Sequence, residues 1–164
     1  MAKVALGSAR EIRANWSKNV EFAPTQVVHP RSEREIVHHI ARATAHGIGI
    51  RAIGAGHSFS AIAKPEGALL TLDHYRGLVH LDSDTGEVTL RAGTRLWEIG
   101  PMLARHDRAL EVMGDVDRQS IAGAISTGTH GTGGRFTGVS GLVTGLKIML
   151  ANGDCVWACL LYTS

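Results

Sequence analysis

The sequence predicts an α+β fold, and three observations support this. One amphipathic helix and short apolar strands come first, a pair of strands around a tight turn follows, and the pattern of a doubly wound sheet is missing. The chain has 164 residues, 44% of them hydrophobic, with 17 Lys and Arg against 15 Asp and Glu. A chain of this size and balance can build one core without disulfides or a structural metal. We therefore expect one globular domain.

The first helix is expected after Pro30. Ser32 and Glu35 have the spacing of a capping box, in which the serine accepts from the amide of Glu35 and the glutamate reaches back to the serine amide. Apolar residues then recur on one face until Gly47, a residue type that commonly follows a helix end. Residues 48–53 form a short apolar strand, and a glycine-rich loop follows directly at its carboxyl end, where ligands bind in α/β proteins.

The later elements follow from periodicity and turn chemistry. Residues 78–81 and 87–91 alternate apolar and polar on either side of a turn and predict an antiparallel hairpin. Pro101 should kink the expected helix 94–106 or begin a fresh turn in it. Ser120 is the expected N-cap of a short helix. The other expected elements are a buried strand at 68–72, the helix itself at 121–127, and a strand at 142–150 that leads into the turn 152–154.

Glycine is enriched, with 20 residues against a usual share of about 7%, and it is concentrated in residues 54–59 and 120–134. Glycines allow consecutive backbone amides to point at one spot, so both segments are candidate cradles for a pyrophosphate. The hydroxyls of Ser58, Thr127 and Thr129 would add donors, and a helix beginning near Ser120 would add its positive end. Two tight loops that bind nothing remain the alternative.

Familiar nucleotide motifs do not match. A dinucleotide-binding G-x-G-x-x-G needs glycine where Phe59 stands, and neither segment has the Gly-Lys-Ser/Thr of a P-loop. His57 is the candidate nucleophile, because an imidazole with an ordinary pKa of about 6.5 is neutral near pH 7. A hydrogen-bonded structural histidine is the alternative there. For His130 we expect that structural role, fixing the second segment by hydrogen bonds.

Composition excludes several classes of function. The basic residues are scattered and form no stripe for nucleic acid. No apolar run is long enough for a signal peptide or a membrane span, so we expect a cytoplasmic protein. Cys155 and Cys159 have no second pair for a metal site and are interpreted as unrelated thiols. Residues 159–164, CLLYTS, resemble a translated sequencing adapter, which suggests a non-native tail on the front part of a longer protein.

Several motifs in order resemble one known family. Asn15-Trp16-Ser17, RAIGAGHSF (51–59), LRAGTRLWEI (90–99), GDVDRQSIAGAISTGTHGTG (114–133) and LVTGLKIMLANGD (142–154) are similar to the FAD-binding domain of the vanillyl-alcohol-oxidase (PCMH) type. Within it, they most resemble the sugar-1,4-lactone oxidases (L-gulonolactone and D-arabinono-1,4-lactone oxidases) and alditol oxidases. The resemblance implies a small parallel-stranded lobe, an antiparallel-sheet lobe and FAD between them. It divides the chain into an N-terminal extension (1–13), an incomplete FAD-binding domain (14–158) and the tail (159–164).

The resemblance also implies the site residues and the chemistry. FAD contacts carry over to Ala52, Ile53, Gly54, Ala55, Gly56, His57, Ser58, Asp115, Ser120, Gly123, Thr127, Gly128, Thr129 and His130. His57 matches a histidine that many members bond to the flavin 8α-methyl carbon. Asp115 stands where alditol oxidases have serine, which puts a side-chain contact there in doubt.

The implied reaction oxidises a carbinol of a polyol or sugar lactone by hydride transfer to flavin N5. Oxygen or another acceptor then reoxidises the flavin. The substrate-binding half lies outside this sequence, so no catalytic residue is expected in it, and alone it should be inactive. A non-covalent FAD dehydrogenase of the same fold, a module that binds FAD or a phosphosugar without catalysis, and a glycine-rich scaffold that binds nothing remain as alternatives.

Overall fold

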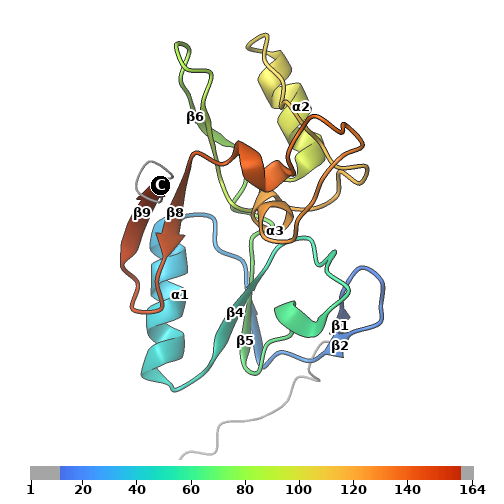
Figure 1. Cartoon of the computed structure of the whole chain (residues 1–164). Coiled ribbons are helices and arrows are strands. Elements are labelled where there is room, and N and C mark those ends of the chain that lie inside the picture. Colours follow the sequence, from blue (N-terminus) through green and yellow to red (C-terminus); the bar gives the residue numbers. More distant parts are fainter. Residues whose placement is uncertain (1–11, 160–164) are drawn as a thin grey trace, which may run out of the picture.

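The computed structural model describes residues 12–159. The expected N-terminal extension and C-terminal tail therefore fall almost entirely outside the described residues. Two lobes are stacked in Figure 1, the first holding α1 and β1 to β5 and the second holding β6, β7, α2 and α3. The β8–β9 hairpin reaches back from the second lobe towards α1. This is the mixed helix and sheet architecture that the sequence predicts.

The first lobe is built on a parallel sheet of three strands in the order β3-β5-β4. β3 spans Gln26–Val28, β4 spans Ile50–Ile53, and β5 spans Ala68–Thr71. Every residue of the central strand β5 is buried, as expected for a parallel strand covered on both faces. In register, Ile53 stands beside Thr71, so the carboxyl ends of β4 and β5 lie together. The segment after β4 therefore leaves the sheet at the edge where ligands usually bind.

Helix α1 (Glu33–Ala45) connects β3 to β4. Ser32 is its N-cap as predicted, and its hydroxyl accepts from the amide of Glu35 at 3.3 Å. One detail of the expected capping box is wrong, because the Glu35 carboxylate accepts from the amide of Arg31 and from the Ser32 hydroxyl. The strand that follows α1 begins at Ile50, two residues later than expected. A short antiparallel pair, β1 (Arg13–Ala14) and β2 (Glu21–Phe22), and the 3-10 turn η1 (Ala61–Ala63) complete the first lobe.

The second lobe contains the predicted antiparallel hairpin, β6 (Leu78–Leu81) and β7 (Val88–Leu90). Helix α2 (Leu96–Ala104) is shorter than expected and continues through Pro101 as one helix. Helix α3 spans Ile121–Ile125, and η2 spans Val139–Leu142. A shared core of fully buried residues joins α2 to α3, and its members are Leu96, Ile99, Leu103 and Ala124.

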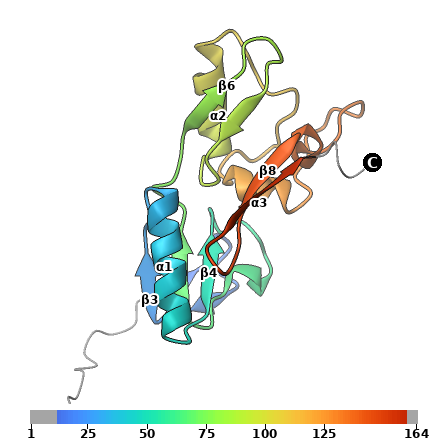
Figure 2. The ribbon, with the colours of Figure 1, turned by 90° about the vertical axis from the view of Figure 1, so that its left-hand side faces the viewer.

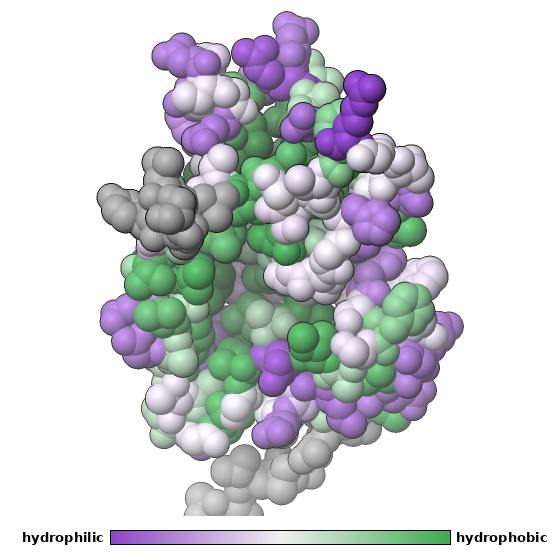
Figure 3. All heavy atoms as spheres, in the orientation of Figure 1, coloured by the Kyte–Doolittle hydropathy of each residue, from purple (hydrophilic) through white to green (hydrophobic). Residues whose placement is uncertain are grey.

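The last two strands form a second antiparallel hairpin, β8 (Gly145–Met149) with β9 (Cys155–Cys159). The strand expected at 142–150 is therefore shorter, because η2 takes up its first residue. The hairpin lies along α1, where Lys147 Nζ donates to Glu33 Oε2 at 2.6 Å (Figure 2). Its surface is apolar, as the green patch over β8 and β9 shows (Figure 3). Both cysteines are free thiols, and no helix of the described chain is long and apolar enough to cross a membrane.

Candidate cofactor site

The first glycine loop leaves the end of β4 with its backbone donors unused. Within the described chain, the amides of residues 54–58 donate no hydrogen bond to another residue. Gly56 has φ +69°, a left-handed conformation that side chains rarely adopt. A cavity of about 180 Å³ adjoins the loop and is lined by Gly54, Ala55 and Gly56, among others. Free amides around a hollow can bind an anion such as a diphosphate.

Gly54 brings this loop against the second glycine segment. A Cβ built on Gly54 would lie only 1.8 Å from the Oγ of Ser120. Ser120 is 1% exposed, and its hydroxyl has no hydrogen-bond partner in the described chain. It occupies the N-cap position of α3 as predicted, yet its side chain does not cap the helix. The two predicted segments therefore meet through Gly54 and Ser120, where a buried polar atom lacks a partner.

The second segment also exposes unused amides. Those of residues 128–131 donate no hydrogen bond within the described chain, and Gly128 has φ +63°. The hydroxyl of Thr127 donates to the carbonyl of Gly123 at 2.8 Å, and its expected role as a donor to a ligand stays a prediction. Helix α3 has five residues, so the expected contribution of its dipole is small. Unused backbone amides are therefore the main donors of this segment.

The remaining predicted residues lie around the two loops. The nitrogen Nδ1 of His130 bonds the carbonyl of the next residue, Gly131, at 2.9 Å, so its expected role in fixing the whole segment stays a prediction. Asp115 is exposed and follows Gly114, which packs against the methyl group of Thr129. Ala52 and Ile53 end β4, Gly123 lies exposed in α3, and Ser58 Oγ lies 3.0 Å from Ser60 Oγ. No hydrogen bond joins residues 54–58 to 127–131 in the described chain.

His57 is held by a ring contact. Its imidazole stacks on the indole of Trp16 with centroids 5.1 Å apart and planes 19° from parallel. Burial, and then the positive charge of Arg95, lower the pKa of His57 below its ordinary 6.5. The ring is therefore neutral at pH 7, as a nucleophile requires.

The sequence analysis missed Arg95 as a site residue. One nitrogen of its guanidinium, Nη2, pairs with Asp73 Oδ1 at 2.5 Å, while Nη1 is buried without a partner in the described chain. Arg95 and Asp73 both line the cavity beside Gly54. The signal that could have revealed it was a cation directly before the apolar pair Leu96-Trp97 in the quoted motif LRAGTRLWEI. Arg95 adds charge to a cradle that otherwise depends on backbone amides.

These features define a class of protein. A glycine loop at the carboxyl edge of a parallel sheet, a second lobe against it and orphaned buried donors fit a domain that binds a nucleotide cofactor through its diphosphate. FAD fits this donor set, because the loop amides and Arg95 match its diphosphate and the neutral His57 lies on the same loop.

Comparison with known families identifies the family to which this chain belongs. Residues 24–158 match the model of the family described as FAD binding domain. This chain belongs to that family. It is 41% identical over 143 residues to an L-gulono-1,4-lactone dehydrogenase of Mycobacterium tuberculosis, covering 87% of this chain and 33% of the relative. It is 30% identical over 139 residues to L-gulonolactone oxidase of Mus musculus, covering 85% and 32% respectively. The chain thus spans about a third of the length of these relatives.

Solved structures confirm the fold predicted from the sequence. A xylooligosaccharide oxidase of Myceliophthora thermophila superposes with a TM-score of 0.79 at 21% identity, covering 90% of this chain and 32% of that one. A cholesterol oxidase from B. sterolicum gives 0.73 at 24% identity, with 90% and 31% covered. The architecture is therefore that of the vanillyl-alcohol-oxidase type. The antiparallel strands of the described chain form three separate pairs, β1–β2, β6–β7 and β8–β9.

Proposed function

We propose that this chain is the FAD-binding part of an oxidoreductase that oxidises a CH–OH group of a sugar 1,4-lactone or an alditol. The observation that carries the proposal is the first glycine loop, which has unused amides and a neutral histidine and adjoins the cavity that Arg95 also lines. The substrate class is supported by the names of the relatives, which act on gulonolactone. Residues that bind the substrate belong, in this proposal, to a part of the protein that follows residue 158.

The residues of this chain have separate roles in the proposal. The amides of residues 54–58 and the Nη1 of Arg95 hold the diphosphate, and the amides of 128–131 contribute from the second lobe. Ser120, which lies against Gly54, offers its unpartnered hydroxyl between them. His57, neutral at pH 7, would form a bond from a ring nitrogen to the flavin 8α carbon. The imidazole N–H and one C–H of the 8α-methyl group would be lost as protons, and the two electrons would reduce the flavin itself, which oxygen or another acceptor would reoxidise. FAD, when bound, supplies the hydride acceptor at N5, and oxygen or another acceptor takes the electrons.

Removing the imidazole tests the covalent bond. Protein from the complete reading frame is precipitated in acid, and flavin fluorescence is measured in the protein band. Wild type should give a fluorescent band, whereas His57→Ala should release its FAD into the supernatant while binding it before denaturation. His80→Ala, which alters an exposed histidine of β6 outside both glycine segments, is the matched control and should keep the fluorescent band. If the wild-type band is dark and FAD is found in the supernatant, the covalent attachment is refuted and the protein is a non-covalent flavoenzyme.

Activity distinguishes an enzyme from a binding module. The complete protein is mixed with L-gulono-1,4-lactone, D-arabinono-1,4-lactone and xylitol under anaerobic conditions, and bleaching of the flavin absorbance is followed. Bleaching by any of the three supports an oxidoreductase of this class. Stable FAD binding without bleaching by any of them would favour a module that binds the cofactor alone or a different substrate class.

A further inference from the structure

The loop between β1 and β2 holds the backbone on both sides of His57. The amide of Trp16 donates to the carbonyl of Gly56 at 2.9 Å. The side chain of Asn15 donates to the carbonyl of Ser58 at 2.9 Å and accepts from the amide of Val20 at 3.2 Å. Asn15 is 6% exposed, so these bonds are shielded from competing water. The residues that flank His57 are therefore fixed from outside their own loop.

The imidazole itself is oriented by Trp16. Neither ring nitrogen of His57 makes a hydrogen bond to another described residue. The stacked indole of Trp16 is therefore the main contact that orients the imidazole. Stacking covers a face of the imidazole and leaves the nitrogens at the ring edge free. Phe59 meets the indole edge-on, with centroids 6.3 Å apart, and completes the row of rings.

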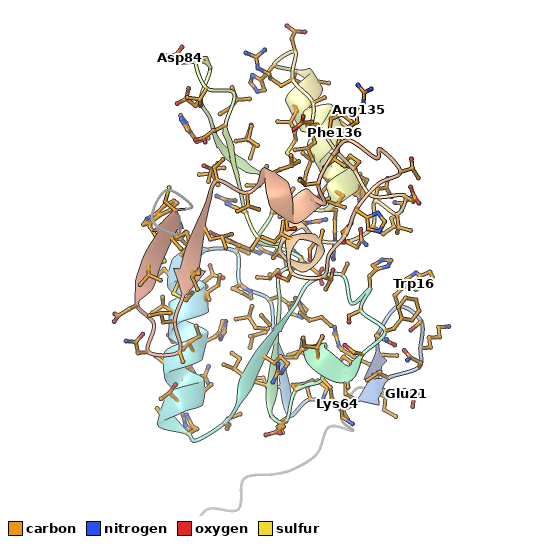
Figure 4. The ribbon with its side chains drawn as sticks, in the orientation of Figure 1. Trp16, Glu21, Lys64, Asp84, Arg135 and Phe136 are labelled. Carbon is orange, nitrogen blue, oxygen red and sulfur yellow. The ribbon has the colours of Figure 1, made fainter. Side chains whose placement is uncertain are left out.

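The exposure of Trp16 argues against a purely structural role. Its side chain lies on the β1–β2 loop, on the side of the first lobe away from α1 (Figure 4), and it is 62% exposed. An indole placed for core packing would be buried, because its contribution to stability scales with the area removed from water. The ring contacts that the structure gives for this indole are with His57 and Phe59.

We infer that Trp16 is a positioning residue that holds the His57 imidazole in the orientation needed to bond to the flavin. This inference rests on the proposed covalent attachment at His57. An aromatic contact of this geometry raises the population of one ring orientation over the others by about 3- to 10-fold. The rate of covalent incorporation should depend on Trp16 by that factor, while the amount of FAD bound should not.

The test compares Trp16→Leu, Trp16→Phe and the control Trp97→Leu, which alters another exposed tryptophan, in α2. Apoprotein from the complete reading frame is mixed with FAD, and the fluorescence of the acid-precipitated band is followed in time beside the total flavin bound. The leucine variant should incorporate flavin about 3- to 10-fold more slowly at unchanged total binding. Phenylalanine should restore most of the rate, and Trp97→Leu should match wild type.

A second readout reports the ring itself. With histidine labelled by 13C at Cε1, the His57 signal is assigned through its loss in His57→Gln. Trp16→Leu should shift it, because the ring current of the indole is removed, and Trp16→Phe should retain part of the original shift. An unchanged signal, an unchanged incorporation rate or a loss of all FAD binding in Trp16→Leu would each overturn the positioning role. Wild type without covalent flavin would instead refute the proposed covalent attachment at His57, on which this inference rests.

Discussion

Gly54→Ala tests the contact that joins the two glycine segments. The added Cβ would lie 1.8 Å from Ser120 Oγ and 3.0 Å from Ser120 Cβ, whereas ordinary contact begins at 3.4 Å. Rotation of the hydroxyl relieves the first contact but leaves the second, and Ser120 is too buried to retreat freely. Overpacking of this kind costs about 1–3 kcal/mol of unfolding free energy. The midpoint of thermal unfolding should fall by roughly 2–12 °C.

The assay is urea and thermal unfolding of the apoprotein, followed by circular dichroism. Gly49→Ala is the matched control, since Gly49 precedes the other end of the same strand and an added Cβ there meets nothing within 4 Å. Ser120→Gly removes both clashing atoms, and glycine at an N-cap costs only a few tenths of a kcal/mol. The double variant Gly54→Ala/Ser120→Gly should therefore recover most of the lost stability. Equal stability of Gly54→Ala and Gly49→Ala would refute the close approach of the loops.

Three further predictions concern the loop, the histidines and the hairpin. Gly56→Ala should lower the free energy of unfolding in urea by about 1–2 kcal/mol, because φ at this position is +69°. Gly56→Val should in addition fail to bind FAD in a fluorescence titration. The control Gly134→Ala, whose added Cβ meets open space, should change neither stability nor FAD binding. Folding lowers the pKa of His57 and His39 through burial. Below the ordinary histidine pKa of 6.5, these two residues therefore bind more protons in the unfolded chain than in the folded one. Their contribution to the free energy of unfolding is thus present above pH 6.5 and is lost as the pH falls towards the folded pKa values. A urea midpoint that stays constant when the pH is lowered from 7 to 5 would contradict this. Lys147→Met should lower the urea midpoint only slightly, since its pair with Glu33 is partly exposed and screened by solvent. A large loss of stability that persists in 1 M salt would show that packing, not charge, holds the hairpin.

The sequence was sufficient to predict those elements whose signals are local. The cap at Ser32, the apolar run of β5 and the turn between β6 and β7 each act over a few residues, and each was found close to its predicted place. β1, β2 and β3 were missed, because two or three residues carry no measurable periodicity. These short strands exist because tertiary pairing stabilises them.

The candidate site was predicted in part for a similar reason. Glycine clustering in two segments predicts where backbone approaches a ligand, and the structure brings Gly54 of one segment onto Ser120 of the other. The pairing of Arg95 with Asp73 and the stacking of Trp16 on His57 join residues far apart in sequence. Single-sequence patterns do not encode such pairs. The sequence also did not predict that the Thr127 hydroxyl donates to the carbonyl one helical turn before it.

The contact between the β8–β9 hairpin and α1 has a consequence for the order of folding. Lys147 and Glu33 are separated by 114 positions in the sequence, and closing so long a loop carries an entropic cost that short-range contacts avoid. During synthesis, α1 leaves the ribosome long before its partner strand exists. On the growing chain, one flank of α1 therefore has no partner until the β8–β9 hairpin has been synthesised.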